Sequence, residues 1–100
     1  MHFKVAEYGE VFSTRNRGAE LLGKLEREAR GASSVELDFD GVRSVGYSFA
    51  DEFVGELAER ASRRESSIEI SLVNASDRVE RVILGSLKRR GVDRAVVVPA

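Results

Sequence analysis

Apolar and polar residues alternate in several short stretches of the chain, which is typical of strands with one buried face. Near the start, Phe3 and Val5 alternate with His2 and Lys4, so we expect His2 on the exposed side. The predicted strands cover residues 2–6, 34–39 and 67–73, and the apolar run 95–98 predicts a last strand before Pro99. Each of these strands is expected to turn its apolar side chains toward a shared core.

Three longer stretches repeat their apolar residues at helical spacing. The predicted helices cover residues 15–30, 49–63 and 77–90. Capping residues support these limits, because serine and threonine favour helix starts and glycine favours helix ends. Ser13 or Thr14 is expected to cap the first helix and Ser76 the third, while Gly31 and Gly91 end them.

Strands that alternate with helices predict parallel neighbours joined by right-handed crossovers. Parallel strands covered on both faces read as continuous apolar runs, whereas these strands alternate, so we expect one open face. Tyr8 and Gly9 predict a tight hairpin turn into a second strand near residues 10–12. We therefore predict a single α/β domain over residues 1–100, with two layers, a mainly parallel sheet, an N-terminal hairpin and helices mostly on one face.

Composition excludes several classes of function. The chain has 100 residues, 42% of them hydrophobic and 33% charged, and a net charge of −1, which argues against nucleic-acid binding. The longest apolar run is too short to cross a membrane and the N-terminus lacks a signal-peptide pattern, so we expect a cytoplasmic protein. There is no cysteine and one histidine, which excludes thiolate chemistry and sites built on several imidazoles. We expect neither a cofactor nor catalysis.

Residues 37–57, LDFDGVRSVGYSFADEFVGEL, combine an Asp-Phe strand end, a valine in the next turn and Ser-Phe-Ala-Asp-Glu at a helix start. This stretch resembles the STAS domain, the fold of bacterial anti-sigma factor antagonists and of the cytoplasmic ends of sulfate transporters. The chain is most similar to the STAS-like family of unknown function. Ser13 or Thr14 beside Arg15, and Asn74 at a strand end, fit that family's pattern. The resemblance implies a STAS-like fold and a protein-binding role.

Anti-sigma factor antagonists carry an Asp-Ser-Ser-Gly run between a strand and a helix, and a partner kinase-ATPase phosphorylates its first serine. The resemblance places Gly46 at the aspartate of that run, Tyr47 at the switch serine, Ser48 at the second serine and Phe49 at the glycine. It therefore implies a histidine-kinase-like ATPase as partner. Ser48 becomes the candidate phosphorylation site, while Tyr47 occupies the position of the known acceptor.

The residues around Ser48 also have a purely structural interpretation. Ser48 and Asp51 are three positions apart, close to a capping box, and Asp51 and Glu52 would favour the helix dipole in the first turn. We therefore expect Ser48 to cap the helix, a role that can coexist with phosphorylation. Free N–H groups of a helix start would favour a phosphate there, and the charge of Asp51 would repel it.

Two arginines and one leucine complete the candidate site. Arg15 and Arg17 open the first helix, where cations oppose the dipole, so we expect ion pairs with nearby acids or binding of a phosphate or a partner's acid. Leu84 falls off the inward stripe of the third helix and is a candidate interface residue. A homodimer is a separate candidate assembly, to which no residue is assigned. The predicted binding residues are Arg15, Arg17, Tyr47, Ser48, Asp51, Glu52 and Leu84.

Three functions are compatible with these residues. The first is a non-enzymatic protein-interaction module in bacterial regulation, which uses the turn 44–48 and the exposed side of the second helix. The alternative is a small anion or nucleotide-binding domain that uses Arg15, Arg17 and the helix N-termini. The third is a magnesium-dependent phosphotransfer enzyme, because carboxylates at the ends of parallel strands suit magnesium. Its ligands would be Asp38, Asp40, Asp51 and Glu52.

Overall fold

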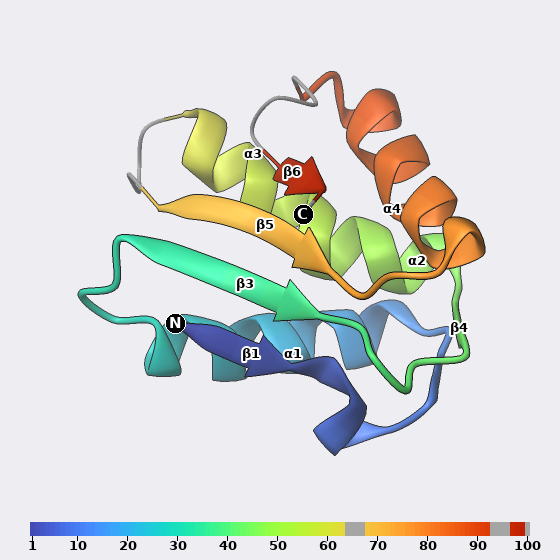
Figure 1. Ribbon diagram of the computed structural model, residues 1–100. Helices are drawn as coiled ribbons and strands as arrows, with labels where there is room; N and C mark the ends of the chain where they lie inside the picture. Colours follow the sequence, from blue (N-terminus) through green and yellow to red (C-terminus); the bar gives the residue numbers. More distant parts are fainter. Residues whose placement is uncertain (64–67, 93–96, 100) are drawn as a thin grey trace.

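The computed structural model describes residues 1–63, 68–92 and 97–99, which form alternating strands and helices (Figure 1). The elements in chain order are β1 (His2–Lys4), η1 (Val5–Tyr8), β2 (Val11–Phe12), α1 (Arg15–Glu28), β3 (Ser34–Asp38), β4 (Ser44–Val45), α2 (Tyr47–Ala50), η2 (Asp51–Gly55), α3 (Glu56–Ser62), β5 (Glu69–Val73), α4 (Asp77–Arg90) and β6 (Val97–Pro99). Residues 95 and 96 of the predicted last strand lie outside the described ranges.

The main sheet has four parallel strands in the order β1-β3-β5-β6. Its register places buried side chains opposite one another: Phe3 faces Leu37, and Leu37 faces Leu72. Because the strands follow one another in sequence order, each crossover helix can lie on the same side of the sheet. The predicted parallel pairing of the main strands is confirmed.

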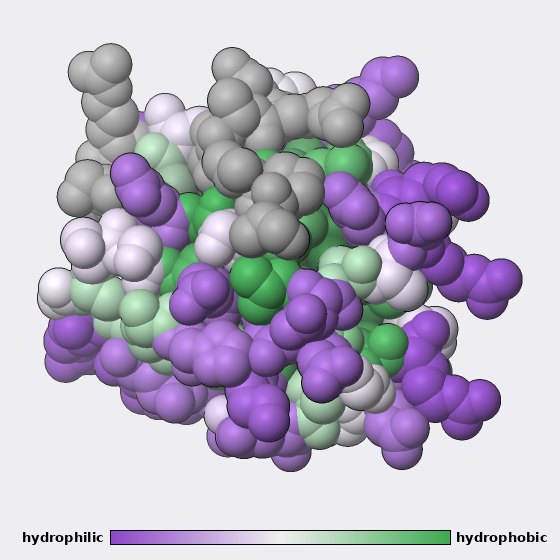
Figure 2. All heavy atoms as spheres, in the orientation of Figure 1, coloured by the Kyte–Doolittle hydropathy of each residue, from purple (hydrophilic) through white to green (hydrophobic). Residues whose placement is uncertain are grey.

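The helices cover one face of this sheet. In Figure 1, α1 and the rod formed by α2, η2 and α3 lie behind the strands, and α4 packs against α2 and η2. The opposite face carries exposed polar side chains, among them Lys4, Glu36 and Glu69, and Figure 2 shows hydrophilic residues over its lower half. The two-layer α/β fold with helices on one face is confirmed.

The predicted N-terminal hairpin is wrong. β1 pairs with β3, whereas β2 pairs with β4 in a separate two-stranded parallel sheet. Between them, η1 forms a 3-10 turn rather than a two-residue hairpin loop. The turn is held by packing, because Val5 is fully buried and the Tyr8 ring stacks on the Phe3 ring with 5.4 Å between centroids. The chain is thereby redirected out of the main sheet.

The long helix over residues 47–62 contains a π turn in its middle. Within η2, the Glu56 N–H donates to the Asp51 carbonyl, five residues back, instead of the usual four. The wider turn includes Phe53, which belongs to a row of packed aromatic rings. The centroid of the Phe49 ring lies 4.7 Å from that of Phe12 and 5.5 Å from that of Phe53. Because residues five apart then follow each other along the axis, Asp51 and Glu56 project toward the same side.

Helix α1 approaches this rod closely at Gly18. A Cβ atom at Gly18 would lie 2.7 Å from the Phe49 carbonyl oxygen and 3.3 Å from the Phe53 nitrogen. Those neighbours are backbone atoms, so they cannot rotate away. The absence of a side chain at Gly18 therefore sets how near α1 lies to α2 and η2.

The predicted caps of α1 and α4 are confirmed except at Gly31, because α1 ends at Glu28 with Ala29 as its C-cap. Thr14 Oγ1 accepts a hydrogen bond from the Arg17 N–H at 3.1 Å, and Ser76 Oγ accepts one from the Val79 N–H at 3.2 Å. Gly91 ends α4 in the left-handed conformation, with φ of 71°. These local signals were readable because capping depends on few neighbouring residues.

We predict that Gly18→Ala destabilises the protein by about 1–3 kcal/mol, because the added methyl group forces two packed helices apart. Gly23→Ala is the matched control on the same helix, since its Cβ would meet only an Arg27 nitrogen at 3.5 Å within contact range. That control should stabilise the protein by about 0.5–1 kcal/mol through helix propensity. Urea unfolding of both variants measures the difference, and equal effects would contradict the close approach.

Candidate functional site

A surface hollow of about 240 Å³ lies at the start of α2, and we call it the Ser48 hollow. Its lining residues are Arg15, Tyr47, Ser48, Asp51, Arg89 and Arg90. Four of the predicted site residues therefore come together, although they belong to α1 and to the rod. The other two lining residues come from the last turn of α4. Three guanidinium groups and one carboxylate line the hollow.

Tyr47 forms one wall of the hollow. Its side chain is among the exposed large hydrophobic groups of the described residues, with 48% relative exposure. The Arg89 guanidinium carbon lies 4.3 Å from the centroid of the ring, in a cation–π contact. A Cβ atom at Gly85 would lie 3.2 Å from the ring edge, so Tyr47 also lies against α4. The ring is thus exposed to solvent yet held in place.

Ser48 does not cap the helix, contrary to the prediction. The helix begins at Tyr47 and its N-cap is Gly46, which makes no side-chain cap. The helix begins two residues before the predicted start at residue 49. The Gly46 N–H donates a hydrogen bond to the Phe12 carbonyl at 2.7 Å, and this contact fixes Gly46 in front of the helix. Ser48 is consequently the second helical residue, and it is exposed at the hollow. The predicted capping box with Asp51 does not form, since Asp51 binds arginines instead.

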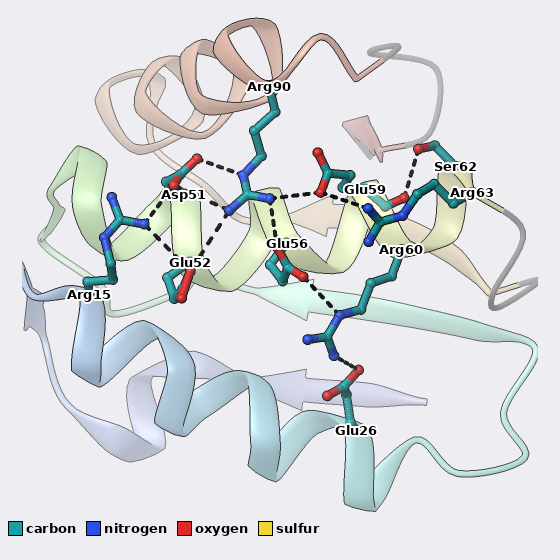
Figure 3. A network of polar contacts seen from close by, with 10 residues as sticks. All are labelled: Arg15, Glu26, Asp51, Glu52, Glu56, Glu59, Arg60, Ser62, Arg63 and Arg90. Carbon is teal, nitrogen blue, oxygen red and sulfur yellow. Dashed lines mark hydrogen bonds and ion pairs between the residues drawn. The ribbon is translucent and has the colours of Figure 1, made fainter.

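Arg90 is the centre of an ion-pair network between α4 and the rod (Figure 3). Its Nε donates to Asp51 Oδ1 at 2.7 Å and its Nη1 donates to Glu56 Oε2 at 2.7 Å. The same Nη1 donates to Glu59 Oε2 at 3.2 Å. The Arg90 side chain is only 16% exposed, so these contacts are partly shielded from water. The π turn makes this possible by placing Asp51 and Glu56 on one side.

The network continues into α1 at two points (Figure 3). Arg15 Nη1 donates to Asp51 Oδ2 at 2.7 Å and lies 3.5 Å from Glu52 Oε2, which confirms the predicted ion pair of Arg15. At the other end, Arg60 pairs with both Glu56 and Glu26. Charged side chains therefore join α1, the rod and α4 in one chain of contacts.

The network also sets the ionisation of its members. Hydrogen bonds from Arg90 lower the pKa of Asp51 and the pKa of Glu56, against the opposing effect of burial. Hydrogen bonds to Asp51 and Glu56 in turn raise the pKa of Arg90. Both carboxylates are therefore ionised at neutral pH, and Asp51 is a weak base for any reaction at the neighbouring Ser48.

Three of the seven predicted residues do not line the hollow: Glu52, which lies 3.5 Å from Arg15, and the more distant Arg17 and Leu84. Arg17 donates to Glu20 Oε1 at 2.7 Å and to the Tyr8 carbonyl, and it does not line the hollow. The structure therefore does not bring Arg15 and Arg17 together at a shared anion site. Leu84 is half-buried and lies on a different face of α4.

The acids of the predicted magnesium site divide between two networks. Asp38 alternates with the apolar Leu37 and Phe39, yet it is buried. It accepts hydrogen bonds from the Asp40 N–H at 2.9 Å and from Asn74 Nδ2 at 3.0 Å. His2 is exposed as predicted, and its Nε2 lies 2.7 Å from Asp38 Oδ2. These hydrogen bonds lower the pKa of Asp38. Among the described residues, no group of three or more acids and histidines could hold a metal ion.

A larger hollow among the described residues lies elsewhere. It has a volume of about 590 Å³ and lies between α1 and α3, with Leu25, Ala29 and Leu57 among its lining residues. Among its charged lining residues, Glu26 and Glu56 both pair with Arg60. We favour the smaller Ser48 hollow because it combines an exposed aromatic ring, a surface hydroxyl and several arginines.

Sequence reasoning missed Arg89 and Arg90. The available signal was the row of acids in the second helix, Asp51, Glu52, Glu56 and Glu59, which needs cations from another element. An undistorted α-helix would place Asp51 and Glu56 about 140° apart, so that row did not indicate a single site.

We predict that Arg90→Met destabilises the protein by about 1.5–3 kcal/mol at pH 7, because three partly buried carboxylates lose their shared cation. The control is Arg89→Met, whose side chain is exposed and makes one cation–π contact, and which should cost less than about 1 kcal/mol. Urea unfolding gives both values, and equal costs would contradict the role of Arg90.

The cost of Arg90→Met should also depend on pH. The pKa values of Asp51 and Glu56 are lowered in the folded state, so their stabilisation is complete above about pH 5 and is lost as pH falls through the folded values. The difference between wild type and variant should shrink accordingly between about pH 5 and pH 3. A difference that stays constant over this range would show that lost packing, not lost charge, causes the effect.

Comparison with known families gave one finding. The family model described as STAS-like domain of unknown function (DUF4325) matches residues 17–80. Comparisons with curated proteins and with solved structures gave no significant match. The matched range includes Tyr47, Ser48 and the acids of the network, but it ends before Arg89 and Arg90. Within the described residues, no helix is long and apolar enough to span a membrane.

Proposed function

Because the chain belongs to the family of STAS-like domains of unknown function, we propose that it is a non-enzymatic protein-interaction module in bacterial regulation. One observation carries this proposal: Tyr47 is an exposed aromatic ring stacked with Arg89 at the rim of the arginine-lined Ser48 hollow. Tyrosine and arginine are enriched among the residues that dominate binding energy in protein interfaces.

The surface is suited to a partner because its main residues are already ordered. Tyr47 lies against α4 at Gly85, and Arg15 and Arg90 are held by Asp51. Ordering these side chains in the free protein lowers the entropy cost of binding. We propose that the partner inserts an acidic group beside Tyr47, where Arg15 and Arg89 can contact it. The resemblance to anti-sigma factor antagonists suggests a histidine-kinase-like ATPase as this partner.

Ser48 is the proposed phosphorylation site on the same surface. Its side chain is exposed and shares the hollow with Arg15, Arg89 and Arg90. A phosphate on Ser48 would gain charge-assisted hydrogen bonds from arginines and would repel Asp51, so it would compete for the cations of the network. Phosphorylation would thereby change both the charge and the geometry of the binding surface.

The lining of the hollow supports a binding role over a catalytic one. A nucleophilic serine needs a base within hydrogen-bond reach. Asp51 is the carboxylate that lines the hollow, and its arginine contacts lower its pKa. A carboxylate bound to two guanidinium groups accepts a proton poorly, so Ser48 is not activated there.

We predict that the purified protein binds the histidine-kinase-like ATPase encoded nearest to its gene, and that Tyr47→Ala weakens this binding about 30-fold, as expected for an aromatic anchor. Isothermal titration calorimetry measures both affinities. The matched control is Glu36→Ala, which changes an exposed residue on the open face of the sheet and should leave affinity unchanged. Loss of binding with Glu36→Ala but not with Tyr47→Ala would place the interface on the open face.

We also predict that this ATPase, given ATP and magnesium, phosphorylates Ser48 and that the phosphoprotein releases the ATPase. Mass spectrometry of the intact protein and of its peptides locates the phosphate, and Ser48→Ala should abolish it. Phosphate on another serine in the Ser48→Ala variant would contradict the assignment.

The three arginines of the hollow favour one alternative, the binding of a small anion or nucleotide. This alternative uses Arg15, Arg89 and Arg90 rather than the predicted pair of Arg15 and Arg17. Thermal shift with inorganic phosphate and with ATP separates the two functions. Saturable stabilisation that Arg15→Met removes, without any binding to the ATPase, would favour the small ligand.

A further inference from the structure

The outer face of α4 forms a second shallow hollow, of about 420 Å³. Its lining residues are Asp77, Glu80, Arg81, Leu84, Gly85 and Lys88, which we call the α4 stripe. Successive residues of the stripe are three, one, three, one and three positions apart in the sequence. Residues three and four positions apart are neighbours on a helix surface, so the stripe forms a continuous band along three turns. None of the residues that carry the proposed function belongs to this stripe, although the Tyr47 ring borders it at Gly85.

The α4 stripe has an ordered distribution of charge. Asp77 and Glu80 lie at its N-terminal end, whereas Arg81 and Lys88 follow toward the C-terminal end. The half-buried Leu84 and the small Gly85 lie between Glu80 and Lys88. The stripe therefore carries two negative and two positive groups around an apolar centre, where the Tyr47 ring lies against Gly85.

We propose that the α4 stripe binds the same stripe of a second copy of this chain, in an antiparallel dimer with two-fold symmetry. An isologous interface requires a surface that complements itself, and this stripe does so when the helices run in opposite directions. With Leu84 near the two-fold axis, Glu80 faces Lys88 of the partner subunit, and the symmetry repeats this pair. An unrelated partner would not require both signs of charge in this order.

One further feature favours the antiparallel arrangement. Antiparallel helices place the positive end of one dipole near the negative end of the other. A single pair of helices buries little surface, so the interface belongs to the weak class. We expect a dissociation constant of about 10–200 µM.

Charge reversal tests this dimer without any partner protein, so its outcome is independent of the proposed function. Sedimentation velocity of the wild type from about 5 to about 500 µM should show a reversible shift from monomer to dimer. Glu80→Lys and Lys88→Glu each create two like-charge pairs across the axis, so each variant should weaken the dimer at least about tenfold. The control Glu36→Lys reverses an exposed charge on the open sheet face and should dimerise as the wild type does.

Mixing the two single variants gives the decisive result. One chain then carries a lysine at both positions of the pair and the other carries a glutamate at both, so a mixed dimer regains two attractive pairs. An equimolar mixture of the two variants should sediment as a dimer, and so should the double variant Glu80→Lys with Lys88→Glu. Such rescue also shows that the single variants remain folded.

Three outcomes would overturn the proposal. One is a wild type that stays monomeric at the highest concentration. Another is a pair of single variants that dimerise as tightly as the wild type. The third is loss of the dimer in Glu36→Lys with no effect of the α4 variants, which would assign self-association to the open sheet face.

Discussion

The contact of Arg90 with Asp51 and Glu56 across the π turn is the interaction on which the candidate site depends. It attaches the last turn of α4 to the middle of the long helix, through hydrogen bonds of 2.7 Å to each carboxylate. The guanidinium group lies over Gly55, where a Cβ atom would come within 3.0 Å of Arg90 Nε. The π turn, its last residue Gly55 and the Arg90 side chain packed on Gly55 therefore form one unit. This unit places the neighbouring Arg89 beside Tyr47.

This unit also explains why α4 contributes to separate surfaces. Arg90 faces the rod, Arg89 stacks with Tyr47 at the Ser48 hollow, and the α4 stripe faces outward. Adjacent residues of a helix project about 100° apart, so a single helix can serve all three directions. A change in the attachment of α4 would consequently move residues of the binding surface and of the α4 stripe together. Arg15 adds a link to α1 through the same Asp51 carboxylate.

Much of the fold could be predicted from sequence because its signals are local and periodic. The alternation in residues 34–39 and the caps at Thr14 and Ser76 each depend on a few neighbouring residues. The structure confirms both caps, and it confirms the alternation as far as Leu37, after which Asp38 is buried. The N-terminal hairpin could not be predicted correctly, because packing of Val5 and stacking of Tyr8 on Phe3 override the turn preference of Gly9. Propensity is a weak guide where tertiary contacts decide the turn.

The candidate site was only partly predictable. Tyr47, Ser48, Asp51 and Arg15 meet as expected, since they follow strand ends and helix starts at one edge of the fold. Ser48 was wrongly expected to cap its helix, because Gly46 is fixed by a backbone contact to Phe12 that sequence spacing does not reveal. The π turn is a deviation from helical periodicity, so a periodic analysis could not place Arg90 against its acids.

The most direct test of this account is a double-mutant cycle between Arg90 and Asp51. Free energies of unfolding are measured in urea at pH 7 for the wild type, Arg90→Met, Asp51→Asn and the double variant. If Arg90 attaches α4 to the rod through this carboxylate, the two substitutions should be coupled by about 1–3 kcal/mol. Additive effects, within about 0.5 kcal/mol, would show that the two side chains act independently and would contradict the account.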